Sequence, residues 1–192
     1  MVTTLEGLCQ AYLGESQARN RYTFYAKVAS DEGYEQIAEI FRQTADQEKE
    51  HAKQLFLLFT ELKKKIAPND KLVMKEVEVP FSYATTKENL EAAAAGEHHE
   101  FTMMYPEFAK VAEKEGYKDI ANKMKAIAKA EAHHEERYKK LLAALPSFFK
   151  RDKAVSWVCR ECGYEHSGNT PPEKCPLCGK PKSFYQTKAE EY

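Results

Sequence analysis

The sequence predicts a mainly α-helical chain: a four-helix bundle with a long crossover, followed by a small metal-binding domain. Residues 1–152 have the Ala-, Glu-, Lys- and Leu-rich composition of long helices. The same residues contain an internal repeat of one helical hairpin. The last forty residues, 153–192, instead hold four of the five cysteines and four of the eight prolines. Together, these three observations predict both parts of the chain.

We expect the bundle to occupy residues 1–146, a linker 147–152 and the small domain 153–192. The boundary falls at Pro146, because proline cannot continue the hydrogen-bond ladder of a helix. Within the bundle, the alternating stretch Val73–Val79 lies between two prolines and predicts extended chain. This crossover separates the two helical halves.

The composition excludes several classes of function. A net charge of −1 offers no surplus of positive charge, so we expect neither nucleic acid nor a membrane surface as a partner. The longest apolar run, Leu55–Phe59, is far shorter than the about 20 residues that span a bilayer. The first residues lack the pattern of a secretory signal, so we expect a cytoplasmic protein.

The two halves of the bundle repeat each other. Glu48-x-x-His51 matches Glu131-x-x-His134 at an offset of 83, and Gly14-Glu15 matches Gly96-Glu97 at an offset of 82. One extra residue therefore lies in the third helix, after Glu97. An insertion of one residue in a helix is usually absorbed as a π-bulge, which we expect here. Two such hairpins joined by a crossover make a bundle with a pseudo-twofold axis.

Ionisable residues interrupt the apolar stripe of every predicted helix. The stripes advance by alternating steps of four and three residues, as in the seam of a left-handed bundle. Near the middle of each helix, the stripe contains ionisable residues instead of apolar ones. Five carboxylates and two imidazoles should therefore converge in the centre of the bundle. They are Glu15, Glu48, His51, Glu97, Glu100, Glu131 and His134. The nearby Glu50, Glu135 and Glu136 lie off the stripe, and we expect them on the solvated surface.

Multivalent cations are needed to compensate so many buried carboxylates, since even one unpaired buried charge costs several kcal/mol. A Glu and a His three residues apart lie on one helical face and can bind one ion together. Carboxylates with one imidazole per ion suit iron or manganese. Glu48 and Glu131 occupy symmetric positions and are the natural bridging ligands. The matched Tyr22 and Tyr105 are either plain core residues or hydrogen-bond partners of the ligands.

Two Cys-x-x-Cys-Gly motifs define a second metal site. Without an export signal, they indicate a tetrathiolate site rather than disulfides, with Cys159, Cys162, Cys175 and Cys178 as ligands. The glycine after each motif permits a positive φ. A small aromatic core should consist of Trp157, Tyr164, Phe184 and Tyr185. The spacing does not identify the metal: a structural zinc site and a redox-active iron site both fit, and the aromatic residues favour iron. Cys9 is left over and is expected to be an inert core thiol.

Taken in order, these motifs resemble the rubrerythrin family over essentially the whole chain. The resemblance implies a ferritin-like di-iron bundle and a small β-rich, rubredoxin-like domain with one iron bound by four cysteines. It also implies a peroxidase that reduces hydrogen peroxide to water in oxidative-stress defence. The expected electron donor is a rubredoxin-type protein or a flavoprotein, supplied ultimately by NAD(P)H. A homodimer or higher homo-oligomer is implied, in which one subunit's Fe(Cys)₄ centre can serve its partner.

The candidate catalytic residues are Glu100, His51, Tyr22 and Tyr105. Glu100 has no acidic counterpart in the first half, where Ala18 occupies the matching position. A carboxylate favours the ferric ion, whereas a neutral imidazole tolerates the ferrous ion. We therefore hypothesise that one iron is bound by His51 when reduced and by Glu100 when oxidised, as the family resemblance also implies.

Three other functions use the same residues. A ferritin-type ferroxidase or iron-binding protein could carry a zinc-stabilised C-terminal module. A manganese catalase-like site could disproportionate peroxide without a donor. A non-enzymatic scaffold could bind metal in the bundle and use the tail for interactions.

Overall fold

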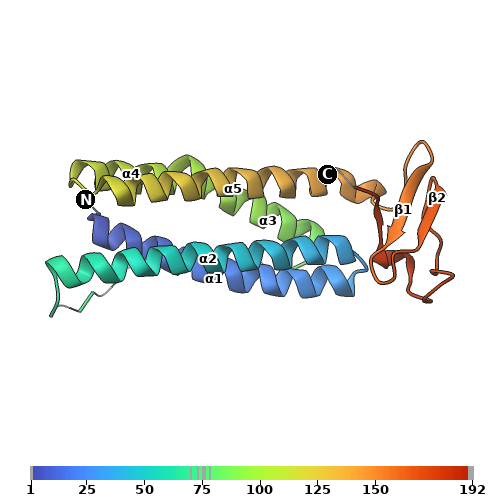
Figure 1. The fold of residues 1–192 in the computed structure, drawn as a ribbon, viewed down its shortest axis with the longest axis horizontal. Coiled ribbons are helices and arrows are strands. Elements are labelled where there is room, and N and C mark those ends of the chain that lie inside the picture. Colours follow the sequence, from blue (N-terminus) through green and yellow to red (C-terminus); the bar gives the residue numbers. More distant parts are fainter. Residues whose placement is uncertain (1, 70, 73, 75–76, 78, 190–192) are drawn as a thin grey trace.

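The computed structural model describes residues 2–69, 71–72, 74, 77 and 79–189. Its long helices form two antiparallel hairpins that lie side by side along the molecule (Figure 1). The first hairpin consists of α1 (Thr4–Asp31) and α2 (Glu35–Ile66). In the second, α3 (Thr86–His99), the π-helix η1 (Glu100–Met104) and α4 (Tyr105–Lys114) continue one another and pack against α5 (Lys118–Ala144).

Matching capping boxes start the first helix of each hairpin. The hydroxyl of Thr3 accepts from the backbone N–H of Glu6, whose carboxylate accepts from the backbone N–H of Thr3. Thr85 and Glu88 make the same pair of hydrogen bonds at the start of α3. Each box satisfies amide groups that a helix leaves free at its first turn. The internal repeat therefore extends to the residues that begin the helices.

Two glutamates in the hairpin turns tie the hairpins together. Glu115 Oε2 accepts from the backbone N–H of Thr4 at 3.1 Å, and Glu32 Oε2 accepts from that of Thr86 at 3.0 Å. Both threonines are buried. Each turn thus binds the helix start of the other hairpin, where a carboxylate also meets the positive end of the helix dipole.

The extra residue of the second half is accommodated in the π-helix η1. This confirms the predicted π-bulge, and Glu100 is its first residue. The wider i→i+5 turn takes up one residue without ending the helix. Pro106 follows in the first turn of α4, where its missing N–H costs little.

The bundle core is divided into two apolar clusters. One lies toward the C-terminal domain and is largely aromatic, with Tyr22, Phe41 and Tyr138 fully buried. The other surrounds Leu8 and Leu55 and is largely aliphatic. In every helix the predicted ionisable residues lie in sequence between the parts that enter these two clusters. The acidic layer therefore separates two apolar cores.

Part of the predicted crossover lies outside the described residues. Of the stretch Val73–Val79, only Met74, Val77 and Val79 are described. None of the described residues between α2 and α3 belongs to a helix or strand. In the described chain, no helix combines the length and apolarity needed to cross a membrane.

The C-terminal domain is a three-stranded antiparallel sheet in the order β2-β1-β3. The strands are β1 (Val155–Cys159), β2 (Glu165–Gly168) and β3 (Tyr185–Thr187). Two short 3₁₀ helices accompany them, η2 (Leu145–Ser147) before the sheet and η3 (Lys182–Phe184) before β3. Trp157 and Tyr185 are buried, and Tyr164 and Phe184 pack against them, which confirms the predicted aromatic core.

This domain contacts the bundle at the α1–α2 turn (Figure 1). The ring of Tyr34 lies 5.6 Å from that of Phe148 and 6.1 Å from that of Phe149, just after α5. A Cβ placed on Gly33 would lie 3.6 Å from the side chain of Ser183. Gly33 itself has a φ of 84° and ends the first helix in a conformation that glycine adopts without strain.

The reciprocal turn contacts lead to a stability prediction. Glu32→Ala and Glu115→Ala each remove an acceptor from a buried N–H, so each should lower the free energy of unfolding by about 1–3 kcal/mol. The two changes act at opposite ends of the bundle, so their effects should add in the double variant. Urea unfolding followed by circular dichroism measures both. The exposed Glu107→Ala serves as control and should change stability by less than about 0.5 kcal/mol. Equal stabilities for the wild type, the two single variants and the double variant would contradict the prediction.

Candidate metal centres

The four predicted cysteines of the tail converge on one point. Their sulfur atoms all lie within 4.8 Å of one another. Cys159 Sγ is 3.7 Å from Cys178 Sγ, and Cys162 Sγ is 3.6 Å from Cys175 Sγ. Four sulfurs placed about 2.3 Å from one central ion lie about 3.8 Å apart, whereas disulfide sulfurs lie about 2 Å apart. The spacing therefore fits a tetrahedral ion and excludes disulfides.

Two equivalent turns hold these cysteines. Gly163 N–H donates to the carbonyl of Cys159 and Gly179 N–H to that of Cys175, both at 2.9 Å. Each glycine has a φ of 74°, which confirms the predicted positive φ. Against the effect of burial, hydrogen bonds from Tyr185 and from backbone amides lower the pKa of Cys175 to about 6. Against a backbone hydrogen bond from Tyr164, burial and the other three thiols raise the pKa of Cys162 to about 12.

In the bundle, six of the seven predicted ligands form two overlapping groups. Atoms of each group lie within 4.8 Å of one another. The first group is Glu15, Glu48, His51 and Glu131, and the second is Glu48, Glu97, Glu131 and His134. Glu48 and Glu131 belong to both groups, as the predicted bridging ligands of two ions would. The described chain thus presents a di-metal carboxylate site.

Both histidines direct the same ring nitrogen into the site. His134 Nδ1 lies 2.8 Å from Glu131 Oε2 and 3.1 Å from Glu48 Oε1. His51 Nδ1 lies 2.9 Å from an oxygen of each of the same two carboxylates. The side chain of His134 is only 2% exposed, whereas that of His51 is 16% exposed. The two half-sites are therefore alike in their donors and unlike in their access to solvent.

Within the two ligand groups, five buried atoms lack a hydrogen-bond partner in the described chain. They are Glu15 Oε2, Glu48 Oε1, both carboxylate oxygens of Glu131, and His134 Nδ1. Buried polar atoms in proteins are almost always paired, so unpaired oxygens at the centre of a bundle are costly. A pair of divalent cations would satisfy them together.

The pKa values report the same crowding of charge. Burial and neighbouring carboxylates raise the pKa values of Glu15 and Glu97 well above the usual range. Burial, Glu131 and Glu48 raise the pKa of Glu100 to about 8. Burial opposes ionisation of Glu48 too, but its close contacts with the two histidines outweigh burial and lower its pKa to about 2. Without cations, protons must neutralise part of this set.

The matched tyrosines hydrogen-bond to ligands of the opposite hairpin. Tyr22 Oη donates to Glu97 Oε1 at 2.6 Å, and Tyr105 Oη donates to Glu15 Oε1. Both rings are fully buried. Of the two roles that the sequence left open, the geometry places these phenols in contact with the ligands. Each fixes the orientation of a carboxylate that also approaches an ion position.

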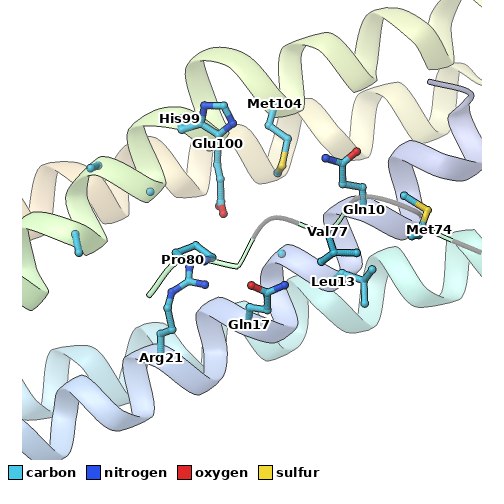
Figure 2. A pocket seen from close by; sticks show the side chains of 14 residues that line it. Gln10, Leu13, Gln17, Arg21, Met74, Val77, Pro80, His99, Glu100 and Met104 are labelled. Carbon is cyan, nitrogen blue, oxygen red and sulfur yellow. The ribbon is translucent and has the colours of Figure 1, made fainter. Parts of the chain in front are cut away.

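Glu100 stands apart from both ligand groups. It borders a cavity of about 370 Å³ between α1, the third helix and the crossover. Figure 2 shows its carboxylate pointing from η1 into this cavity, with Arg21 extending from α1 on the opposite side. Most of the remaining lining is apolar or small, with Leu13 and Met104 among the larger side chains. Of the seven predicted ligands, only Glu100, the carboxylate without a symmetric counterpart, lines this cavity.

The sequence did not single out some residues around the site. Arg21 faces Glu100 and acts to lower its pKa. Gln47 contacts His134 on the side away from the carboxylates: Gln47 Oε1 lies 3.0 Å from His134 Nε2. The prediction that Glu135 is solvated was wrong: its side chain is 10% exposed, because it pairs with His98 and Lys139. The helical stripe gave no signal for these contacts, since all three residues lie off it.

The comparisons with known proteins agree with these two centres. The family profile described as rubrerythrin matches residues 6–142, and that of the rubrerythrin rubredoxin-like domain matches residues 157–186. A Methanocaldococcus jannaschii protein is 56% identical over 100% of this chain and 96% of its own length. Rubrerythrin of Porphyromonas gingivalis is 45% identical over 98% of this chain and 92% of its own. A solved structure of nigerythrin in a mixed-valence state has a TM-score of 0.66 and 33% identity, covering 98% of this chain and 88% of that one.

The fold and the two sites define a ferritin-like di-metal bundle joined to a rubredoxin-like Cys₄ domain. The chain belongs to the rubrerythrin family.

The raised pKa values predict how the stability of the metal-free bundle depends on pH. Between pH 4.5 and about 8, folded Glu100 keeps a proton that the unfolded chain releases, and Glu15 and Glu97 act in the same direction. The unfolded state then binds fewer protons, so the free energy of unfolding falls as pH rises. His134 adds to the fall as pH rises from 6.5 to about 9, because its folded pKa is raised to about 9.

Thermal unfolding of the chelator-treated chain, followed by far-ultraviolet circular dichroism, measures this effect. The midpoint should fall steadily across the window and fall less in the metal-loaded chain, because cations replace the protons. A midpoint that rises with pH in the metal-free chain would show that the carboxylates are not buried together.

Proposed function

We propose that this chain is a non-haem di-iron peroxidase that reduces hydrogen peroxide to water in oxidative-stress defence. The observation that carries the proposal is the presence, in one chain, of a buried carboxylate–histidine site for two cations and a tetrathiolate site for one. The reaction consumes one peroxide, two electrons and two protons and forms two waters. A site with two metal positions suits the two-electron step, and a single-ion site suits electron supply one at a time.

The donor set of the bundle suits iron or manganese. Each ion position offers one imidazole and three carboxylates, an oxygen-rich set that suits iron or manganese better than zinc. Two ferrous ions, when bound, would supply both electrons in one event and so avoid release of a hydroxyl radical. Glu48 and Glu131 would bridge them, with Glu15 and His51 on one side and Glu97 and His134 on the other.

The chain's own residues support an exchange of ligands. Glu100 lies outside the six-residue set and points into the cavity, so it is free to enter the site (Figure 2). His51 is the more exposed of the two imidazoles, so it is the ligand that can withdraw. We assign His51 to the reduced state and Glu100 to the oxidised state. Tyr22 and Tyr105 hold Glu97 and Glu15 in place during the exchange.

Electrons would return through an iron bound by the four cysteines. Cys178 and its neighbour Leu177 are exposed, so a donor can approach this centre directly. We propose a rubredoxin-type protein or a flavoprotein as that donor. In a homodimer or higher homo-oligomer, the Cys₄ centre of one subunit would serve the bundle of its partner.

The first test follows the electrons. The purified chain is reduced without oxygen and mixed with one equivalent of hydrogen peroxide, and the ferric–thiolate absorption is recorded over time. Rapid recovery of this colour means that electrons flow from the Cys₄ centre through the bundle to peroxide. A chain that stays colourless throughout carries zinc in the tail, which favours a ferritin-type ferroxidase with a zinc-stabilised module.

A second prediction concerns Glu100. Glu100→Ala should retain both ions, because six other ligands remain, yet lose at least about tenfold of its peroxide turnover, equal to about 1.4 kcal/mol in the barrier. Metal analysis and steady-state peroxide consumption give the two readouts. Glu107→Ala on the exposed face of α4 is the matched control and should behave as the wild type. Undiminished turnover in Glu100→Ala would remove Glu100 from the mechanism.

A further inference from the structure

Outside the ligand set, three side chains form a connected series that ends on one of the two histidines. Gln47 Oε1 accepts from His134 Nε2 at 3.0 Å and from Arg137 Nη2 at 3.2 Å. Arg137 Nη2 also donates to the hydroxyl of Thr44, which is fully buried in α2. The series therefore links α5 to α2 on the outer side of His134, opposite the carboxylates that its Nδ1 faces.

The chemistry of these groups fixes each orientation in turn. A guanidinium can only donate, so the atom of Gln47 that faces Arg137 must be its carbonyl oxygen. The same oxygen faces His134 Nε2, which must therefore carry a hydrogen. With the hydrogen on Nε2, the lone pair that His134 offers to a metal is on Nδ1, the nitrogen that points into the site. Arg137 thus fixes the orientation of the Gln47 side-chain amide, and this amide fixes the tautomer of His134.

The internal repeat supplies a comparison within the same molecule. At the offset of 83, Gln47 corresponds to Ala130 and Arg137 to Gln54. Ala130 has no side-chain acceptor, and Gln54 instead bonds to Glu50 and Lys123 on the surface. Among the residues that the structure describes, none accepts a hydrogen bond from Nε2 of His51. Metal-binding histidines almost always donate their second N–H to a protein group or to water, so the two half-sites differ in this support.

We propose that Gln47, oriented by Arg137, is a positioning residue that holds His134 as a permanent metal ligand, while His51 has no such restraint and is free to leave. This inference rests on the two-ion site of the proposed function but not on peroxidase activity. These contacts explain why His51, and not His134, would exchange with a carboxylate in the proposed mechanism.

The test measures metal binding and the histidine ring directly. The probe is Zn²⁺, titrated calorimetrically into the full chain after its Cys₄ site has been filled with the same metal. In Gln47→Leu, the dissociation constant of one bundle ion should rise about 10–100-fold, while that of the other changes by less than about twofold. In nitrogen-15 NMR spectra of the zinc-loaded chain, the Nε2 hydrogen of His134 should exchange slowly with water in the wild type and rapidly in the variant.

Three further variants separate positioning from a general structural effect. Gln47→Glu keeps an acceptor for both donors and should restore slow exchange and tight binding. Gln54→Leu replaces the glutamine that corresponds to Arg137 in the first half of the repeat. This control should change neither the zinc dissociation constants nor the exchange of the His134 hydrogen. Arg137→Met frees the amide to rotate and should speed exchange at His134, which keeps the inference testable if Gln47→Leu fails to fold. The inference would be overturned if Gln47→Leu kept the wild-type dissociation constants and the slow exchange of the His134 hydrogen. It would also be overturned if the variant lost affinity for both bundle ions equally.

Discussion

Mutual repulsion among buried carboxylates is the constraint on which the rest of the structure depends. Five glutamates lie at mid-height of the bundle, and burial together with repulsion between neighbouring carboxylates raises the pKa values of Glu15, Glu97 and Glu100. The apolar cores on either side of this layer must provide the stability that the layer lacks. The site is therefore built to be completed by cations, and the paired hairpins, caps and tyrosines keep its ligands in place until they arrive.

The molecule is nearly symmetric in its two ligand groups and asymmetric in the residues around them. The capping boxes, the turn glutamates and the two tyrosine–glutamate hydrogen bonds all follow the internal repeat. Departures from it are concentrated around the site: Glu100 on the π-helix, the cavity beside it, and the Gln47–Arg137 pair behind His134. Symmetry thus supplies two equal positions for ions, and the departures make the two positions chemically different.

Much of this arrangement could be predicted from the sequence, because helical periodicity places Glu48 and His51 on the same inward face as their apolar neighbours. The cysteine spacing and the following glycines predicted the tetrathiolate turns for a similarly local reason. The role of Gln47 could not be predicted, since its partner His134 is 87 positions away and neither helix alone shows that they meet. Glu135 was misassigned because a tertiary contact with His98 and an ion pair with Lys139 on the same helix cover an off-stripe position.

The inserted residue in the third helix has a consequence for how such a site can diversify. Two copies of one hairpin produce a symmetric pair of half-sites, and changing both halves at once would disturb both ions. A single insertion absorbed within η1 alters one copy only and leaves the caps and the inward stripes of the other three helices in register. One local change of this kind is therefore enough to make the two ion positions of a repeated hairpin unequal.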